Sequence, residues 1–165
     1  MASATLCVVD MQPYFYASQE EWLMENVLRE IRQSKNRDIG IIVIEYEGCG
    51  VTDSRILREC MVHPKFVRLV KRESDAAPLI LDAVMTNHFS ADKFIIAGVE
   101  TDACITDTIN GLSMLRPSSQ IVVVADAVNM LGRTHTKRGF KGFHCKSQVV
   151  FKNKNVRLPR NQYGA

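Results

Sequence analysis

Long apolar runs, paired cysteine motifs and a strong excess of one charge are all missing from this sequence of 165 residues. No stretch approaches the ~20 consecutive apolar residues that a membrane helix needs. The first residues, MASATLCVVDMQ, have no basic region before their apolar run, so a signal peptide is not predicted. The net charge of +3 is too small to indicate a nucleic acid or a membrane surface as partner.

Paired cysteines are also missing. The five cysteines are Cys7, Cys49, Cys60, Cys104 and Cys145. Their number is odd and no two have CxxC spacing, which disfavours a disulfide framework and favours a reducing, cytoplasmic location. One of them is therefore free to act chemically.

What is present is typical of one globular domain spanning residues 1–165. The composition, 46% hydrophobic and 24% charged, is ordinary for such a domain. There is no internal repeat. The basic segment 152–165 is expected to be a surface arm or a subunit contact rather than part of the core.

Apolar runs rich in β-branched residues indicate strands. None alternates cleanly with polar residues, as expected for strands of a parallel sheet buried on both faces. The runs are Thr5–Val9, Ile39–Glu45, Val67–Val70, Lys93–Val99, Ser119–Ala125 and Gln148–Phe151.

The segments between these runs have helical periodicity. They are Gln19–Lys35, Arg55–Met61, Ala77–Asn87 and Cys104–Leu115. Strands alternating with helices predict an α/β fold: a doubly wound, mainly parallel sheet of five to six strands with helices on both faces.

Reactive side chains follow several of these strands. Asp10, Lys71 and Cys104 come at or just beyond the ends of three of them. Ligands of open α/β sheets bind beyond the carboxyl ends of the strands, so a carboxylate, an amine and a thiol are expected to meet there. Glu45, Glu100 and Asp126 occupy comparable positions.

Each of the three residues also has a purely structural interpretation. A carboxylate after a strand often forms a turn or a cap, a lysine is usually solvated, and a cysteine is usually a small buried hydrophobe. Cys104 differs because GVETDAC runs from a strand into a helix, with Thr101 and Asp102 as possible caps. The positive end of the helix dipole lowers the pKa of a thiol in the first helical turn. The free backbone N–H groups of that turn can also bind an oxyanion.

Four sequence blocks resemble the isochorismatase-like cysteine hydrolases, in order and over residues 6–129. They are VVDMQPYF at 8–15, KRESDA at 71–76, GVETDACITDT at 98–108 and VVVADAV at 122–128. The resemblance implies a catalytic triad of Asp10, Lys71 and Cys104. It also implies a cis peptide bond at Val99–Glu100 that aims the Glu100 and Cys104 amides at an oxyanion.

The resemblance further implies a substrate pocket bordered by Gln12 and Phe15, and a structural role for Asp126. Glu45 and Tyr46, from the loop EYEGCG, are added as candidate pocket residues, while Glu45 and Glu47 could equally be solvated charges. The basic run 133–146 is interpreted as a solvated face rather than an anion site. Relatives are often dimers or tetramers, so a homo-oligomer is expected.

Two departures from the family pattern narrow the function. The metal-binding nicotinamidases of the family carry histidines after the second strand, whereas EYEGCGVTDSR has none. The four histidines, His63, His88, His135 and His144, lack ligand spacing, so neither a metal nor another cofactor is predicted. Members that cleave isochorismate generally lack the nucleophilic cysteine.

The leading hypothesis is therefore a hydrolase that cleaves a small amide, carbamoyl or ureido C–N bond through a Cys104 thioester. One alternative keeps the fold but hydrolyses a non-amide substrate, an enol ether or an ester, with Asp10 leading. Another is a non-catalytic binding or assembly module. A redox role for Cys104 is weaker because no resolving cysteine is close in sequence.

Overall fold

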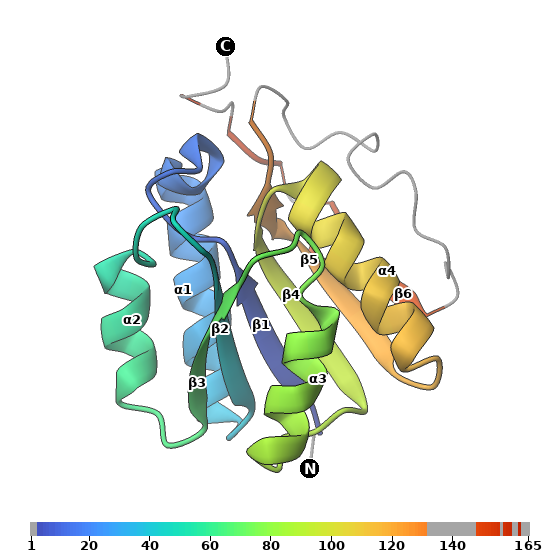
Figure 1. Ribbon diagram of the computed structural model, residues 1–165. Coiled ribbons are helices and arrows are strands. Elements are labelled where there is room, and N and C mark those ends of the chain that lie inside the picture. Colours follow the sequence, from blue (N-terminus) through green and yellow to red (C-terminus); the bar gives the residue numbers. More distant parts are fainter. Residues whose placement is uncertain (1–2, 132–147, 156, 160–161, 163–165) are drawn as a thin grey trace.

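A single parallel sheet organises the chain. The computed structural model describes residues 3–131, 148–155, 157–159 and 162 (Figure 1). In these residues six strands pair in the order β3-β2-β1-β4-β5-β6, and every neighbouring pair is parallel. This confirms the predicted doubly wound α/β architecture.

The strands are short and their central members are buried on both faces. Their bounds are β1 Thr5–Val9, β2 Gly40–Tyr46, β3 Phe66–Lys71, β4 Lys93–Val99, β5 Gln120–Asn129 and β6 Val149–Lys152. All of β1 and the first six residues of β2 are buried, which explains why neither run alternates with polar residues.

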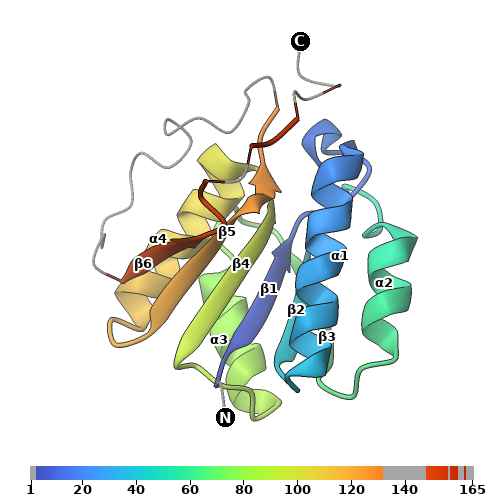
Figure 2. The same cartoon turned by 180° about the vertical axis from the view of Figure 1, so that it is seen from behind.

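Helices cover both faces of the sheet. The α-helices are α1 Glu21–Asn36, α2 Ser54–Met61, α3 Ala77–Thr86 and α4 Thr106–Leu115; two short turns are η1 Tyr16–Gln19 and η2 Thr101–Ile105. Figure 1 shows α3 and α4 in front of the sheet, and Figure 2 shows α1 and α2 on the opposite face. Each pair of helices closes one of two hydrophobic clusters against the strands. In the described segments no helix is long and apolar enough to cross a membrane.

The strand order reverses between β1 and β4. These strands are neighbours although β2 and β3 separate them in sequence, and β1 also pairs with β2 on its other side. A crevice opens at such a switch point, beyond the carboxyl ends of the strands. Asp10 follows β1 directly and Cys104 lies just after β4, so both reach this crevice.

Strand β5 is longer than the sequence predicts. The run was expected to end at Ala125, which would place Asp126 at the ligand-binding edge; instead β5 continues to Asn129. An irregularity between Ile96 and Gly98 of β4 shifts the pairing register, so Gly98 pairs with Val128. The placement of Asp126 at the strand end is therefore wrong, because a bulge inserts residues that no local pattern announces.

The buried Asp126 carboxylate serves the packing of α1 and β6. Its Oδ2 accepts a hydrogen bond from Arg29 at 2.9 Å and its Oδ1 accepts one from Asn153 at 2.9 Å. Lys152 donates to both carboxylate oxygens of Glu30 at 3.0 and 2.8 Å. The start of the predicted basic arm is thus the end of β6 and is tied to α1 of the same chain.

The predicted helix 104–115 begins later and differently. Cys104 lies in η2, a π-helical turn, and the α-helix begins only at Thr106. Thr101 is not a cap, since its hydroxyl donates to the carbonyl of Asn129 at 2.9 Å, and no side chain caps η2. The wider turn keeps the thiol next to the strand end.

Gly98 is required where β4 passes β1. Its φ is +118°, and a Cβ there would lie 2.0 Å from the carbonyl oxygen of Val9. We expect Gly98→Ala to lower the free energy of unfolding by about 3 kcal/mol or more, because backbone must move in addition to the strained φ. Urea denaturation measures the change.

Gly48 provides the matched control for this substitution. Its φ is +77° but nothing lies within 4 Å of an added Cβ. Gly48→Ala therefore isolates the conformational cost, about 1 kcal/mol. Equal losses in the two variants would contradict the close approach of β4 to β1.

Candidate active site

Asp10, Lys71 and Cys104 meet at the carboxyl edge of the sheet. Lys71 Nζ lies 3.0 Å from Asp10 Oδ2, and both side chains are almost completely buried. Cys104 is 6% exposed. The three residues come from separate segments, after β1, at the end of β3 and after β4. A thiol, a carboxylate and an ammonium therefore share one enclosed place.

Lys71 reaches Asp10 across the end of β2. Its strand is two positions away from β1 in the sheet, so the long side chain spans the intervening strand. The ring of Tyr46, the last residue of β2, lies 4.4 Å from Nζ and supplies a cation–π contact. Nζ also donates to the carbonyl oxygens of Glu73 at 3.2 Å and Ser74 at 3.3 Å. Two carbonyls and one carboxylate thus surround the ammonium.

Asp10 is held in the left-handed backbone region, with φ 54°, while its amide donates to the carbonyl of Ile44 at 2.9 Å. Burial raises the pKa of its carboxyl, although Lys71 and the Cys104 thiol oppose this. Within the described segments, neither carboxylate oxygen accepts a hydrogen bond of regular geometry, the Lys71 contact being an ion pair. The carboxylate can therefore accept a further proton donor.

The Cys104 thiol is neutral at rest. Burial, followed by the negative charge of Asp10, raises its pKa to about 12, and Lys71 only partly counteracts this. A nucleophile in this setting requires a base to remove its proton as it reacts. Asp10 is the neighbouring group of the right type.

The turn that carries Cys104 is built around Glu100. The Val99–Glu100 peptide bond is cis. The amides of Ala103 and Ile105 both donate to the carbonyl oxygen of Glu100, at 3.1 and 3.0 Å. The Glu100 side chain accepts a hydrogen bond at Oε2 from the Leu131 amide at 2.9 Å, and the charge of Asp10 acts on its carboxyl. Burial raises the pKa of this carboxyl.

Gln12 stabilises the loop that borders the site. Its Nε2 donates to the carbonyls of Tyr46 at 3.0 Å and Gly50 at 2.6 Å, and its Oε1 accepts from the Tyr46 amide at 2.6 Å. Both donors of the side-chain amide are thus engaged with backbone. Gln12 shapes the site by holding the loop after β2, rather than by offering a free donor.

Glu45 is bound within the protein. Its Oε1 accepts from the Thr52 amide at 2.7 Å and its Oε2 from Arg68 at 2.7 Å. Burial opposes ionisation of Glu45, but these partners outweigh it and lower the pKa of the carboxyl. The proposed contact between Glu45 and a substrate therefore competes with two internal bonds, while Glu47 is exposed and pairs with Arg72.

Phe15 and Cys49 complete the surroundings. Phe15 is half-buried, packs against the hydrophobic cluster under α1 and meets Tyr14 edge to face at 5.4 Å. Cys49, which sequence reasoning left without a role, is half-buried in the loop after β2. Burial raises the pKa of its thiol, and the charges of Asp10 and Lys71 also act on it. The sequence did contain a signal for Cys49: it lies shortly after the second predicted strand, at the edge of the sheet where ligands bind.

Other candidate features lie apart from this site. Among the described residues no group of three or more His, Cys, Asp or Glu side chains is placed to hold a metal ion. His63 is buried and its Nε2 lies 2.9 Å from the carbonyl oxygen of Ile39. The basic run 133–146, with His135, His144 and Cys145, lies wholly outside the described residues, so it is not placed relative to this site.

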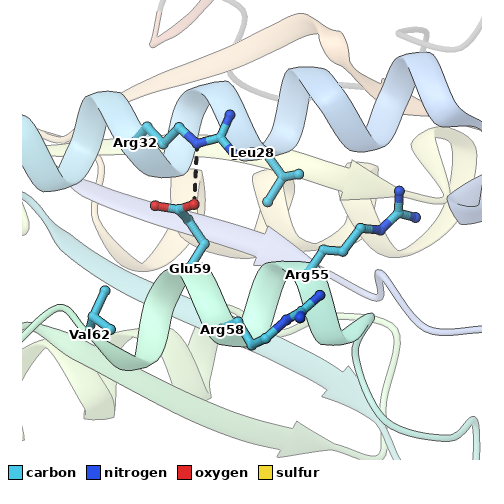
Figure 3. Close-up of a pocket in the computed structure, with 6 residues that line it drawn as sticks. All are labelled: Leu28, Arg32, Arg55, Arg58, Glu59 and Val62. Atoms are coloured by element: carbon cyan, nitrogen blue, oxygen red, sulfur yellow. Dashed lines mark hydrogen bonds and ion pairs between the residues drawn. The ribbon is translucent and has the colours of Figure 1, made fainter.

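A hollow of about 390 Å³ separates α1 from α2 (Figure 3). Its lining residues are Leu28, Arg32, Arg55, Arg58, Glu59 and Val62. Arg32 pairs with Glu59 at 3.2 Å and Arg55 with Glu21 at 2.9 Å. Arg32 and Arg55 each pair with a carboxylate of the other helix, and Asp10, Lys71 and Cys104 do not line the hollow.

Solved structures with this architecture are numerous. YcaC from Pseudomonas aeruginosa has a TM-score of 0.72 and 18% identity, with 90% of this chain and 76% of that one covered. The nicotinamidase from Staphylococcus aureus scores 0.67 at 18% identity, covering 84% and 90%. An isochorismatase from Pseudomonas putida scores 0.66 at 14% identity, covering 83% and 75%.

The chain has the isochorismatase-like fold. The three alignments agree on this although their identities are low. No family model matches the sequence, and no curated protein matches it. The isochorismatase-like fold hosts proteins described by different activities, so the reaction of this member has to be argued from its own residues.

Proposed function

We propose that this protein is a cysteine hydrolase that cleaves a C–N bond in a small amide, carbamoyl or ureido compound. The observation that carries the proposal is the enclosed meeting of Asp10, Lys71 and Cys104. The 3.0 Å ion pair fixes two of these groups, and the thiol interacts electrostatically with both. The near-complete burial of all three favours a small substrate.

Conservation of charge makes the first step feasible in a buried site. At rest the three groups carry one negative charge on Asp10 and one positive charge on Lys71. Transfer of the Cys104 proton to Asp10 moves the negative charge to sulfur, still beside Lys71. The net charge of the site stays zero, so the step avoids the cost of creating an unpaired buried charge.

The bond changes follow from that arrangement. Cys104 Sγ attacks the substrate carbonyl carbon as Asp10 accepts the thiol proton. The amides of Glu100 and Cys104 bind the oxyanion. The carboxylic acid of Asp10 then returns the proton to the departing nitrogen as the C–N bond breaks, leaving a thioester.

Water completes the cycle. Asp10, again a carboxylate, takes a proton from water as the water oxygen attacks the thioester carbonyl. The C–S bond breaks, the acid is released and the proton returns to sulfur.

A substrate panel tests the assignment to C–N bonds. Small primary amides, N-carbamoyl amino acids and ureido acids are incubated with the full chain, and release of ammonia or amine is measured. We expect turnover of at least one of these classes. Hydrolysis of an ester or enol ether alone, with no C–N substrate cleaved, would contradict the proposal. The compartment and the homo-oligomeric state stay predictions.

A further inference from the structure

The loop after β3 is fastened to the helix that follows Cys104. Ser74 Oγ donates to Asp107 Oδ2 at 2.5 Å. The amide of Ala76 donates to the hydroxyl of Thr108 at 3.0 Å, and both residues are buried. We call these two hydrogen bonds the 74–108 latch. They join Lys71's loop to the start of α4, which continues directly from the turn carrying Cys104.

A close approach completes the contact. Gly111 of α4 faces Asp75, and a Cβ on Gly111 would lie 2.3 Å from Asp75 Oδ2. Asp75 Oδ1 accepts from the Ala77 amide at 2.8 Å, which fixes the entry into α3. The glycine inside α4 is thereby explained: it lets the loop lie directly on the helix.

The latch acts on the ammonium through backbone carbonyls. Two of the oxygens that receive hydrogen bonds from Lys71 are the carbonyls of Ser74, which the latch holds directly, and of Glu73, its neighbour in the chain. Nζ has three donors, and besides the two carbonyls it lies 3.0 Å from Asp10 Oδ2 and interacts with the Cys104 thiol. The position of the loop therefore sets where the positive charge stands relative to the thiol.

We propose that Ser74, Asp107 and Thr108 are positioning residues that hold the Lys71 ammonium beside Cys104 by latching its loop to α4. The inference rests on the proposed function in assigning a use to the thiolate. It goes further in naming residues that touch neither the substrate nor the reacting atoms. If the latch is lost, the Lys71 ammonium is no longer held beside Cys104, and the Cys104 thiolate loses the positive charge that stabilises it.

Alkylation of Cys104 tests the latch without any substrate. Iodoacetamide labelling of the intact protein is followed from pH 7 to 11 and quantified on the Cys104 peptide by mass spectrometry. We expect Thr108→Val to lower the labelling rate at a given pH about tenfold, as for a pKa higher by about one unit. Thr108→Ser, which keeps the hydroxyl, should restore the rate.

Two further comparisons separate positioning from stability. Ser113→Ala removes a buried hydroxyl from the same helix that has no hydrogen-bond partner in the described segments, so its labelling profile should match the parent. Ser74→Ala, Asp107→Ala and their double variant should shift the profile equally, since each removes the same Ser74–Asp107 hydrogen bond. A lowered Tm of Thr108→Val with an unchanged profile would overturn the proposal. Failure of the proposed function would instead appear as hydrolysis that survives loss of Cys104.

Discussion

Cys104→Ala is expected to lower the rate of C–N hydrolysis by at least about 10⁴-fold while leaving the fold intact. Without the sulfur there is no thioester, and the remaining groups offer only binding and electrostatic stabilisation. The replaced side chain is small and lies at the edge of the core, so the free energy of unfolding should change little. Initial rates on the substrate identified by the panel, together with a urea unfolding curve, measure both effects.

Cys60→Ala is the matched control. Cys60 is fully buried in α2, on the opposite face of the sheet, so the substitution removes one buried sulfur without touching the triad. Its kcat should equal that of the parent. Full activity in Cys104→Ala would exclude the covalent mechanism, and equal losses in both variants would indicate a general effect of losing a buried thiol.

Asp10→Asn should separate nucleophile reactivity from turnover. The substitution removes the base and the general acid, so hydrolysis should fall about 10³-fold. The same change removes the negative charge that raises the pKa of Cys104, while Lys71 remains. The pKa of the thiol should fall, and iodoacetamide should label Cys104 faster at pH 8, by about tenfold for each unit of pKa. Labelling of the Cys104 peptide and kcat are measured on one preparation. The labelling rate should rise while kcat falls.

Lys71→Met gives the contrasting result. Removing the positive charge should raise the pKa of the thiol, so that both labelling and hydrolysis slow. Each substitution leaves one member of the buried Asp10–Lys71 pair without its counterion and is therefore destabilising, so a urea unfolding curve of each variant establishes that the labelled protein is folded. Faster labelling in Lys71→Met, or slower labelling in folded Asp10→Asn, would contradict the electrostatic account of the site.

The sheet and the meeting of Asp10, Lys71 and Cys104 could be predicted because they depend on local patterns. Fully apolar runs mark buried parallel strands, and the residues that end them must face the same edge. Asp10, Lys71 and Cys104 therefore fall together once the strands are recognised. The observed strand order shows in addition that Asp10 and Cys104 lie on either side of the switch point between β1 and β4. Lys71 reaches them across the end of β2.

The failures concern pairings between distant segments. Asp126 was misplaced because the extra length of β5 follows from an irregularity in its pairing with β4, which no pattern within β5 reveals. The bond between Glu45 and Arg68 depends on the register of β2 against β3.

The 74–108 latch illustrates the same limit. Ser74 and Asp107 lie 33 positions apart, inside two motifs that sequence reasoning treated separately. Each motif was visible, but the contact between them exists only after α3 and α4 have packed against each other. Side chains that hold other side chains in place were accordingly missed, whereas the three residues predicted to meet at the sheet edge do lie together there.

Interception of the acyl-enzyme decides whether Cys104 becomes acylated during turnover. A substrate of the panel is turned over in the presence of hydroxylamine, and acid-quenched samples are digested and analysed by mass spectrometry. The account predicts an acyl group on the Cys104 peptide during turnover and formation of the hydroxamate, both absent in Cys104→Ala. Steady hydrolysis with no hydroxamate and no acylated Cys104, or an acyl group on another residue, would contradict it.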